Sequence, residues 1–121
     1  MKAKKTILLV DDDEDLLSLL QVKLTRDGFA VKTLLNGVNL VSKVSEELPD
    51  LILMDINMPF MNGDELCSCL RQQASTCHIP VILFSGNENI VALSSRCGAN
   101  GFITKPCNPL TLAADLRSHL S

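Results

Sequence analysis

Five polar residues follow four short apolar runs of this 121-residue chain, each at the point where the run ends. Asp11 and Asp12 come after ILLV, and Asp55 comes after LILM. Ser85 comes after VILF, and Lys105 comes after GFIT. If these runs are parallel strands of one sheet, their carboxyl ends meet at one edge, where open α/β sheets bind ligands. We therefore expect three carboxylates, a hydroxyl and an ammonium group to lie together.

This set of groups has a specific chemical logic. Carboxylates about 5 Å apart repel by on the order of 3 kcal/mol per pair at an effective dielectric near 20, so they are not gathered without a cation. Mg²⁺ fits, because it prefers oxygen ligands, keeps several waters and bridges to phosphate. Asn57 is placed to add a backbone carbonyl, while Lys105 and Ser85 add a positive charge and a hydroxyl donor. The set predicts a phosphoryl site with Asp55 as the nucleophile.

Each of these residues also has an ordinary structural explanation. The acidic run from Asp11 to Asp15 suits the start of a helix, where carboxylates cap backbone N–H groups. Asp55 suits a turn, Ser85 a loop cap, and Lys105 a solvated surface. Because all of them fall at strand ends that would share one edge, the combination favours a site.

The remaining pattern predicts the elements that would position these residues. Segments with apolar residues at helical spacing, such as Leu16, Leu20 and Leu24, alternate with the apolar runs. The expected strands are 5–10, 30–34, 51–54, 81–84 and 101–104, and the expected helices are 13–27, 38–48, 64–73, 89–97 and 109–120. Runs 7–10, 51–54 and 81–84 are apolar on both faces, as buried parallel strands are, whereas Lys32 suits an edge strand. The alternation predicts the α/β class, with helices on both faces of a parallel sheet.

Length and composition limit the kind of protein. The length fits one domain over residues 1–121, and we expect no second domain in this chain. A net charge of −3 and the absence of Trp and Tyr argue against a nucleic-acid surface. The apolar runs are far shorter than the about 18 residues of a membrane span. The opening MKAKKTILLV runs into acids without a cleavage site, so we expect no membrane partner and a cytoplasmic location.

The sequence contains five cysteines. Because this number is odd and the spacing shows no regular disulfide framework, we expect reduced thiols. A zinc site of Cys67, Cys69, Cys77 and His78 is the alternative. Because Cys67 and Cys69 are two residues apart on an expected helix, they point to different faces. We therefore favour ordinary apolar packing of these side chains.

Four segments carry the residues above in a defined order and spacing: ILLVDDDEDLL, LILMDINMPFMNG, VILFSG and GANGFITKP. They resemble the receiver domains of two-component response regulators, including chemotaxis regulators, over essentially the whole chain. The resemblance implies a flavodoxin-like (βα)5 fold with strand order 2-1-3-4-5. It also implies that Asp55 accepts a phosphoryl group from a sensor histidine kinase or a phosphotransfer protein. A signalling domain that accepts the phosphoryl group, rather than an enzyme, is therefore expected, although members of this family catalyse their own phosphorylation and dephosphorylation.

The resemblance implies roles for individual site residues. Asp12 would bind Mg²⁺ directly, Asp11 mainly through water, and Asn57 through its backbone carbonyl. Asp55 would also be a metal ligand. Ser85 and Lys105 would hold the phosphoryl oxygens.

Further positions are implied to tune or transmit the signal. Phe102 matches the switch aromatic, whose ring moves inward as the Ser85 hydroxyl is drawn to the phosphoryl group; the alternative is an ordinary half-buried strand aromatic. Asn57 and Asn87 occupy positions that tune phosphoryl lifetime. The bond before Pro106 is typically cis in this family. The fourth helix, fifth strand and fifth helix would form the face that meets an unknown effector.

Three other functions compete with this hypothesis. A phosphatase of the haloacid dehalogenase type would use Asp11 as nucleophile and Asp13 as acid/base, but it needs an acidic pair on a strand end after the lysine. Beyond Lys105 the only acid is Asp115, inside an expected helix. A flavin carrier fails because the acidic first loop would repel the flavin phosphate. A receiver that binds proteins without phosphorylation stays open.

Overall fold

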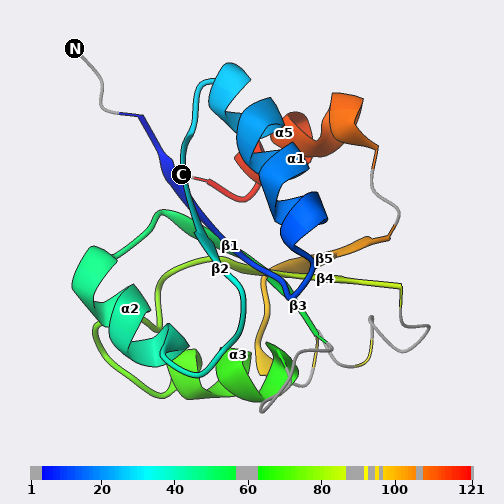
Figure 1. Cartoon of the computed structure of the whole chain (residues 1–121). Helices are drawn as coiled ribbons and strands as arrows, with labels where there is room; N and C mark the ends of the chain where they lie inside the picture. The colour runs from blue at the N-terminus through cyan, green and yellow to red at the C-terminus, as the bar shows by residue number, and fades with distance from the viewer. Residues whose placement is uncertain are drawn as a thin grey trace.

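Five parallel strands form one sheet in the order β2-β1-β3-β4-β5 (Figure 1). They are β1 (Thr6–Val10), β2 (Ala30–Leu34), β3 (Leu51–Asp55), β4 (Val81–Ser85) and β5 (Gly101–Thr104). This confirms the flavodoxin-like strand order and places β2, with Lys32, at an edge. Because β1 lies beside β3 and Val10 pairs with Met54, the residues that follow these strands start from adjacent positions.

The computed structural model describes residues 4–56, 63–86, 92, 95, 97–105 and 108–120, with the backbone alone at 63 and 64. The predictions for Asn57, Asn87 and Pro106 lie outside these residues, as does most of the expected helix 89–97. None of the helices in these ranges is long and apolar enough to cross a bilayer.

Helices cover both faces of the sheet (Figure 1). The pair α1 (Glu14–Arg26) and α5 (Pro109–Arg117) lies on one face, and the pair α2 (Leu40–Glu47) and α3 (Gly63–Arg71) lies on the other. Four expected helices are therefore confirmed, with ends that differ by a few residues. Helix α2 is shorter than expected because Leu48 adopts a left-handed conformation, with φ of 46°, and ends it before Pro49.

Two apolar clusters lie on either side of the sheet, because successive strand residues point to opposite faces. Leu8 and Val10 of β1 pack in the cluster with α2 and α3, whereas Ile7 and Leu9 pack in the cluster with α1. Every residue of β3 and β4 is buried. The strands that end in Asp55 and Ser85 are therefore clamped from both faces, which makes them a rigid support for a site.

The start of α1 accounts for part of the acidic run. The Asp13 side chain caps the helix by accepting a hydrogen bond from the Leu16 N–H at 3.1 Å, and Glu14 and Asp15 lie in the first turn. The helix-start explanation is thus correct for these three acids. Asp11 and Asp12 precede the helix, and the Asp11 side chain accepts a hydrogen bond from the N–H of the capping residue, Asp13, at 3.0 Å.

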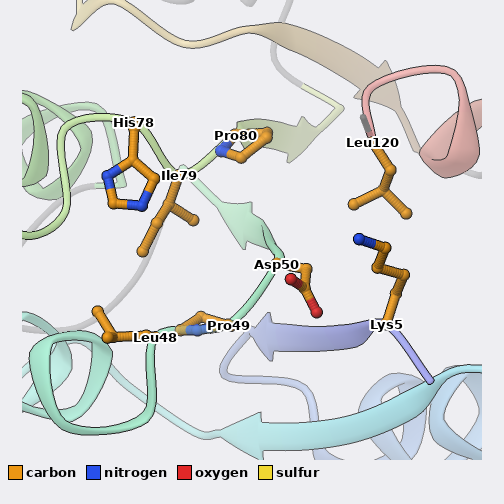
Figure 2. A pocket seen from close by; sticks show the side chains of 8 residues that line it. All are labelled: Lys5, Leu48, Pro49, Asp50, His78, Ile79, Pro80 and Leu120. Carbon is orange, nitrogen blue, oxygen red and sulfur yellow. The ribbon is translucent and has the colours of Figure 1, made fainter. Parts of the chain in front are cut away.

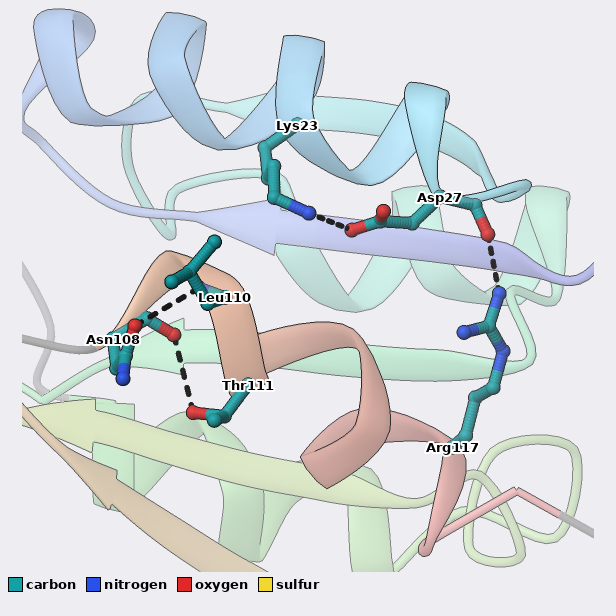
Figure 3. A network of polar contacts seen from close by, with 6 residues as sticks. All are labelled: Lys23, Asp27, Asn108, Leu110, Thr111 and Arg117. Carbon is teal, nitrogen blue, oxygen red and sulfur yellow. Dashed lines mark hydrogen bonds and ion pairs between the residues drawn. The ribbon is translucent and has the colours of Figure 1, made fainter.

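Helix α5 is tied down at both ends (Figure 3). At its start, the Asn108 side-chain oxygen accepts a hydrogen bond from the Leu110 N–H at 3.0 Å, and Pro109 lies in the first helical turn, where its missing N–H costs no hydrogen bond. At its end, the Arg117 guanidinium donates to the Asp27 carbonyl, which follows α1. The same group lies 4.7 Å from the Phe29 ring centroid. The two helices of this face are therefore joined by polar contacts as well as by the core.

We expect Asn108→Ala to lower the free energy of unfolding by about 1 kcal/mol, because an N–H at the start of α5 loses its acceptor. Urea denaturation followed by circular dichroism measures this change. Asn108→Asp keeps the acceptor oxygen and should stay within a few tenths of a kcal/mol of the parent protein. Equal losses in the two variants would contradict a capping role.

Candidate functional site

The carboxyl edge of the sheet brings together the side chains that the sequence placed there. Asp11 directly follows β1, and its N–H donates to the Leu34 carbonyl of β2 at 3.1 Å. Asp55 ends β3, and Ser85 ends β4. Lys105 follows β5, where its N–H continues the ladder by donating to the Ser85 carbonyl at 3.0 Å. Each side chain is thus carried by a strand end that backbone hydrogen bonds hold in place.

Three carboxylates converge at this edge. One oxygen each of Asp11, Asp12 and Asp55 lies within 4.8 Å of the other two. Asp11 and Asp55 are 3% and 5% exposed, whereas Asp12 is exposed and has no hydrogen bond or ion pair within the described part of the chain. These hard oxygen donors fit a divalent cation such as Mg²⁺. Because Mg²⁺ keeps several of its waters, the protein has to supply only some of its ligands, and one side of the site can stay open to solvent.

The Lys105 ammonium group lies among these acids. Its Nζ is 2.9 Å from Asp11 Oδ2 and 3.6 Å from Asp55 Oδ1, so it bridges the two buried carboxylates. It also lies 4.9 Å from the centroid of the Phe84 ring, within the range of a cation–π contact. From the sequence, Lys105 was expected to compensate Asp55, and the shorter contact with Asp11 was missed. Phe84 was missed as well, because it looked like one more apolar residue of its strand.

The electrostatic balance keeps Lys105 charged. Its partial burial lowers the pKa, but the hydrogen bond with Asp11 and the charges of Asp55 and Asp11 outweigh this effect. The pKa of Lys105 is therefore raised above its ordinary value. The ammonium group is a permanent positive charge at neutral pH.

The oxygens of Asp11 are already engaged by the protein. Oδ1 accepts a hydrogen bond from the Asp13 N–H at 3.0 Å, and Oδ2 accepts one from Lys105 at 2.9 Å. Asp13 in turn uses its side chain to cap α1. Both acids that a haloacid dehalogenase-type phosphatase would need are thus occupied by structural hydrogen bonds. This arrangement argues against that alternative.

Phe102 lies apart from the carboxylates. Its side chain is 42% exposed on β5. With Asp115, Ser118 and His119 it lines a surface cavity of about 340 Å³ beside the end of α5. The ring is therefore accessible on the face where a switch aromatic was expected.

The cysteines do not build a metal site in the part of the chain that is described. The three aspartates are the only cluster there with enough His, Cys, Asp or Glu ligands to hold an ion, so Cys67, Cys69, Cys77 and His78 do not come together as one. Cys67 is buried, and its thiol donates to the Cys97 carbonyl at 3.5 Å. No disulfide joins the four cysteines in this part of the chain.

A separate cavity of about 190 Å³ opens elsewhere on the surface (Figure 2). Its lining includes Lys5 before β1, Asp50 before β3 and Pro80 before β4, so it lies at the amino edge of the sheet. None of the predicted site residues within the described ranges lines it. The acidic cluster and this cavity therefore lie at opposite ends of the strands.

Known proteins resemble the chain in sequence over nearly its full length. The family "Response regulator receiver domain" matches residues 7–117. The response regulator PleD of Caulobacter vibrioides is 39% identical over 93% of the chain, which spans 25% of PleD. The alkaline phosphatase synthesis transcriptional regulatory protein PhoP of Bacillus subtilis is 36% identical over 96% of the chain, which spans 48% of PhoP. The chain thus spans about half or less of these relatives.

Solved structures resemble the fold equally well. The chemotaxis response regulator CheY4 of Vibrio cholerae superposes with a TM-score of 0.90 at 28% identity, covering 98% of this chain and 100% of that one. The signal receiver domain of a signal transduction histidine kinase from Syntrophus aciditrophicus gives a TM-score of 0.87 at 36% identity, covering 96% and 89%. With the family match over residues 7–117, these similarities show that the chain belongs to the response regulator receiver domains of two-component systems.

Proposed function

We propose that Asp55 accepts a phosphoryl group from the phosphohistidine of a sensor histidine kinase or a phosphotransfer protein, in a reaction that depends on Mg²⁺. The observation that carries this proposal is the setting of the Asp55 carboxylate. It stands at the end of a fully buried strand, within 4.8 Å of two further aspartates and 3.6 Å from the Lys105 ammonium. A carboxylate held in this way is a positioned nucleophile.

The transfer would use the described residues as follows. An Asp55 oxygen forms a bond to phosphorus while the bond between phosphorus and the donor imidazole nitrogen breaks, and that nitrogen keeps the electron pair and takes up a proton. Lys105 offsets the negative charge of the phosphoryl oxygens, and the Ser85 hydroxyl donates a hydrogen bond to one of them. Because β3 is packed on both faces, the nucleophile loses little freedom when it reacts.

The three aspartates would bind the metal in different ways. Both oxygens of Asp11 hold hydrogen bonds, while Asp12 is exposed, so Asp12 would contact the cation directly and Asp11 through water. Asp55 would be a third ligand, and the Asn57 carbonyl would complete the protein's share. When bound, Mg²⁺ neutralises charge on the phosphoryl oxygens.

The signal would leave the site through β4 and β5. Ser85 pairs with Thr104, two residues beyond Phe102 on the same strand. Drawing the Ser85 hydroxyl toward the phosphoryl group would therefore shift the strand that carries the exposed Phe102 ring. The changed face of the fourth helix, β5 and α5 would then bind an effector. Asn57 and Asn87 would tune the lifetime of the acyl phosphate, and a cis bond before Pro106 would orient Lys105.

Incubation with acetyl phosphate and Mg²⁺ should add the mass of one phosphoryl group to the protein, measured by intact mass spectrometry at neutral pH. Asp55→Asn should abolish this gain, because the amide is not a nucleophile. Asp115→Asn, which changes an acid remote from the carboxylates, should leave it intact. Phosphoryl transfer that persists in Asp55→Asn would refute the proposal.

Mg²⁺ should stabilise the folded protein, because it binds the carboxylates as they are arranged in the native state. At a Mg²⁺ concentration 100 times the dissociation constant, the free energy of unfolding should rise by about 2.7 kcal/mol. Urea denaturation with Mg²⁺ or with EDTA measures this gain. Asp12→Asn should lose most of it, and in EDTA it should be more stable than the parent by about 1 kcal/mol because repulsion is relieved. Asp15→Asn, another exposed acid nearby, is the control and should keep the gain. The same Mg²⁺ effect in Asp12→Asn and the parent would rule out Asp12 as a ligand.

The charge of Lys105 should contribute stability with a definite pH dependence. Because the folded state raises its pKa, this contribution is complete below the unfolded value of about 10.4 and is lost as pH rises through the folded pKa. Without metal, Lys105→Met should be less stable than the parent by about 1 kcal/mol near neutral pH. The difference should shrink toward about pH 11 in urea titrations. Lys43→Met, which removes an exposed ion pair with Glu47, is the control, and a pH-independent difference for Lys105→Met would contradict this account.

A further inference from the structure

Arg71, the last residue of α3, binds a set of oxygens that the proposed phosphorylation chemistry does not use. Its Nε donates to the Gly98 carbonyl at 2.8 Å, and its Nη1 donates to the carbonyls of Cys77 at 3.0 Å and Ile79 at 2.7 Å. Its Nη2 donates to the side-chain oxygen of Asn100. All four acceptors are neutral, and no ion pair of Arg71 is found within the described residues. The guanidinium is therefore used as a planar fork that joins the loop before β4 to the loop before β5.

Asn100 connects this fork to two strands of the sheet. Its side-chain oxygen also accepts a hydrogen bond from the Val81 N–H at 3.0 Å, and its own N–H donates to the Val81 carbonyl at 2.8 Å. Val81 is the first residue of β4, and Asn100 directly precedes β5. The Arg71–Asn100 contact thus fixes the start of β5 against the start of β4.

The backbone at Gly98 is shaped for this arrangement. Its φ of +83° is a left-handed conformation that glycine adopts without strain. A Cβ at this position would come within 3.3 Å of Arg71 Cγ. The glycine therefore allows both the turn and the close approach of the arginine side chain.

Strand β5 depends on such an anchor more than the other strands that carry site residues. It has four residues and lies at the edge of the sheet, so β4 is its only neighbour there. Gly101 and Ile103 are partly buried, whereas Phe102 and Thr104 are exposed. A slip of one residue would move its end by about 3.3 Å and turn each side chain to the other face.

The register of β5 leads directly to the candidate site. The pairing runs from Ile82 with Gly101 to Ser85 with Thr104, and the Lys105 N–H then donates to the Ser85 carbonyl. We propose that Arg71 is a positioning residue: by holding Asn100, it fixes the register of β5 and so places the Lys105 ammonium beside Asp11 and Asp55. Only the phosphorylation part of the test below rests on the proposed function.

The first measurement is amide hydrogen exchange in the metal-free protein. Arg71→Lys keeps the charge but loses the fork, because an ammonium cannot hold four oxygens arranged in a plane. Exchange of the Lys105 N–H should rise about tenfold relative to amides of β1 and β3, as the edge strand opens locally. Asn100→Ala should do the same, whereas Asn100→Asp keeps the acceptor and should restore the protection of the parent.

Arg117→Met is the matched control, because it removes another arginine that donates to a backbone carbonyl and lies over an aromatic ring (Figure 3). It should lower global stability without changing the ratio of Lys105 exchange to β1 exchange. A rise of that ratio in Arg117→Met equal to that in Arg71→Lys would overturn the proposal. So would an unchanged ratio in both Arg71→Lys and Asn100→Ala.

The second measurement is the rate of acyl phosphate formation with acetyl phosphate at saturating Mg²⁺, for variants shown to be folded. Arg71→Lys and Asn100→Ala should react about tenfold more slowly, since a displaced Lys105 no longer meets the phosphoryl oxygens. Arg117→Met should react at the rate of the parent. If the parent takes up no phosphoryl group, the proposed function fails while the exchange data still decide the role of Arg71. A normal rate in Arg71→Lys with a reactive parent would refute the link to Lys105.

Discussion

The structure depends above all on how negative charge is tolerated at the carboxyl edge of the sheet. Asp11, Asp12 and Asp55 are held within 4.8 Å of one another, and two of them are buried. Lys105 is the one ammonium group that contacts this cluster within the described residues. With three carboxylates and one ammonium, the cluster keeps a surplus of negative charge that a divalent cation would balance. The metal binding and the phosphoryl transfer that we propose would thus have the same electrostatic origin.

The two edges of the sheet have different tasks. At the carboxyl edge, carboxylates lie close together and repel one another, so the strands that carry them have to be rigid. At the amino edge, Arg71 and Asn100 join loops, and the acceptors of the guanidinium are neutral. Strand β4 is buried on both faces, and β5 pairs with it along its whole length, so a constraint at the amino edge is transmitted along this ladder to Ser85 and Lys105. This division explains why an arginine far from the acids matters for their geometry.

The family relationship and the local geometry answer different questions. The match over residues 7–117 shows a receiver domain, and the structural neighbours show its fold. The chain spans only 25% of PleD and 48% of PhoP, so the activities of those whole proteins are not transferred to it. The local hydrogen bonds argue against the phosphatase alternative, because the Asp13 side chain caps a helix.

The sequence by itself determined the five strands and the four described helices, and it predicted which polar side chains meet at the carboxyl edge. Runs that are apolar on both faces have to be covered strands, Lys32 marked an edge, and polar residues after parallel strands have to share one end of the sheet. Strand order came from the family resemblance, because periodicity carries no information on which strands are neighbours. Only the tertiary structure decided that Lys105 lies closer to Asp11 than to Asp55, that Phe84 lies beneath it, and that Arg71 reaches residues 27 and 29 positions away. These contacts join elements that are distant in the chain. How close such elements lie in space is set by packing rather than by residue type.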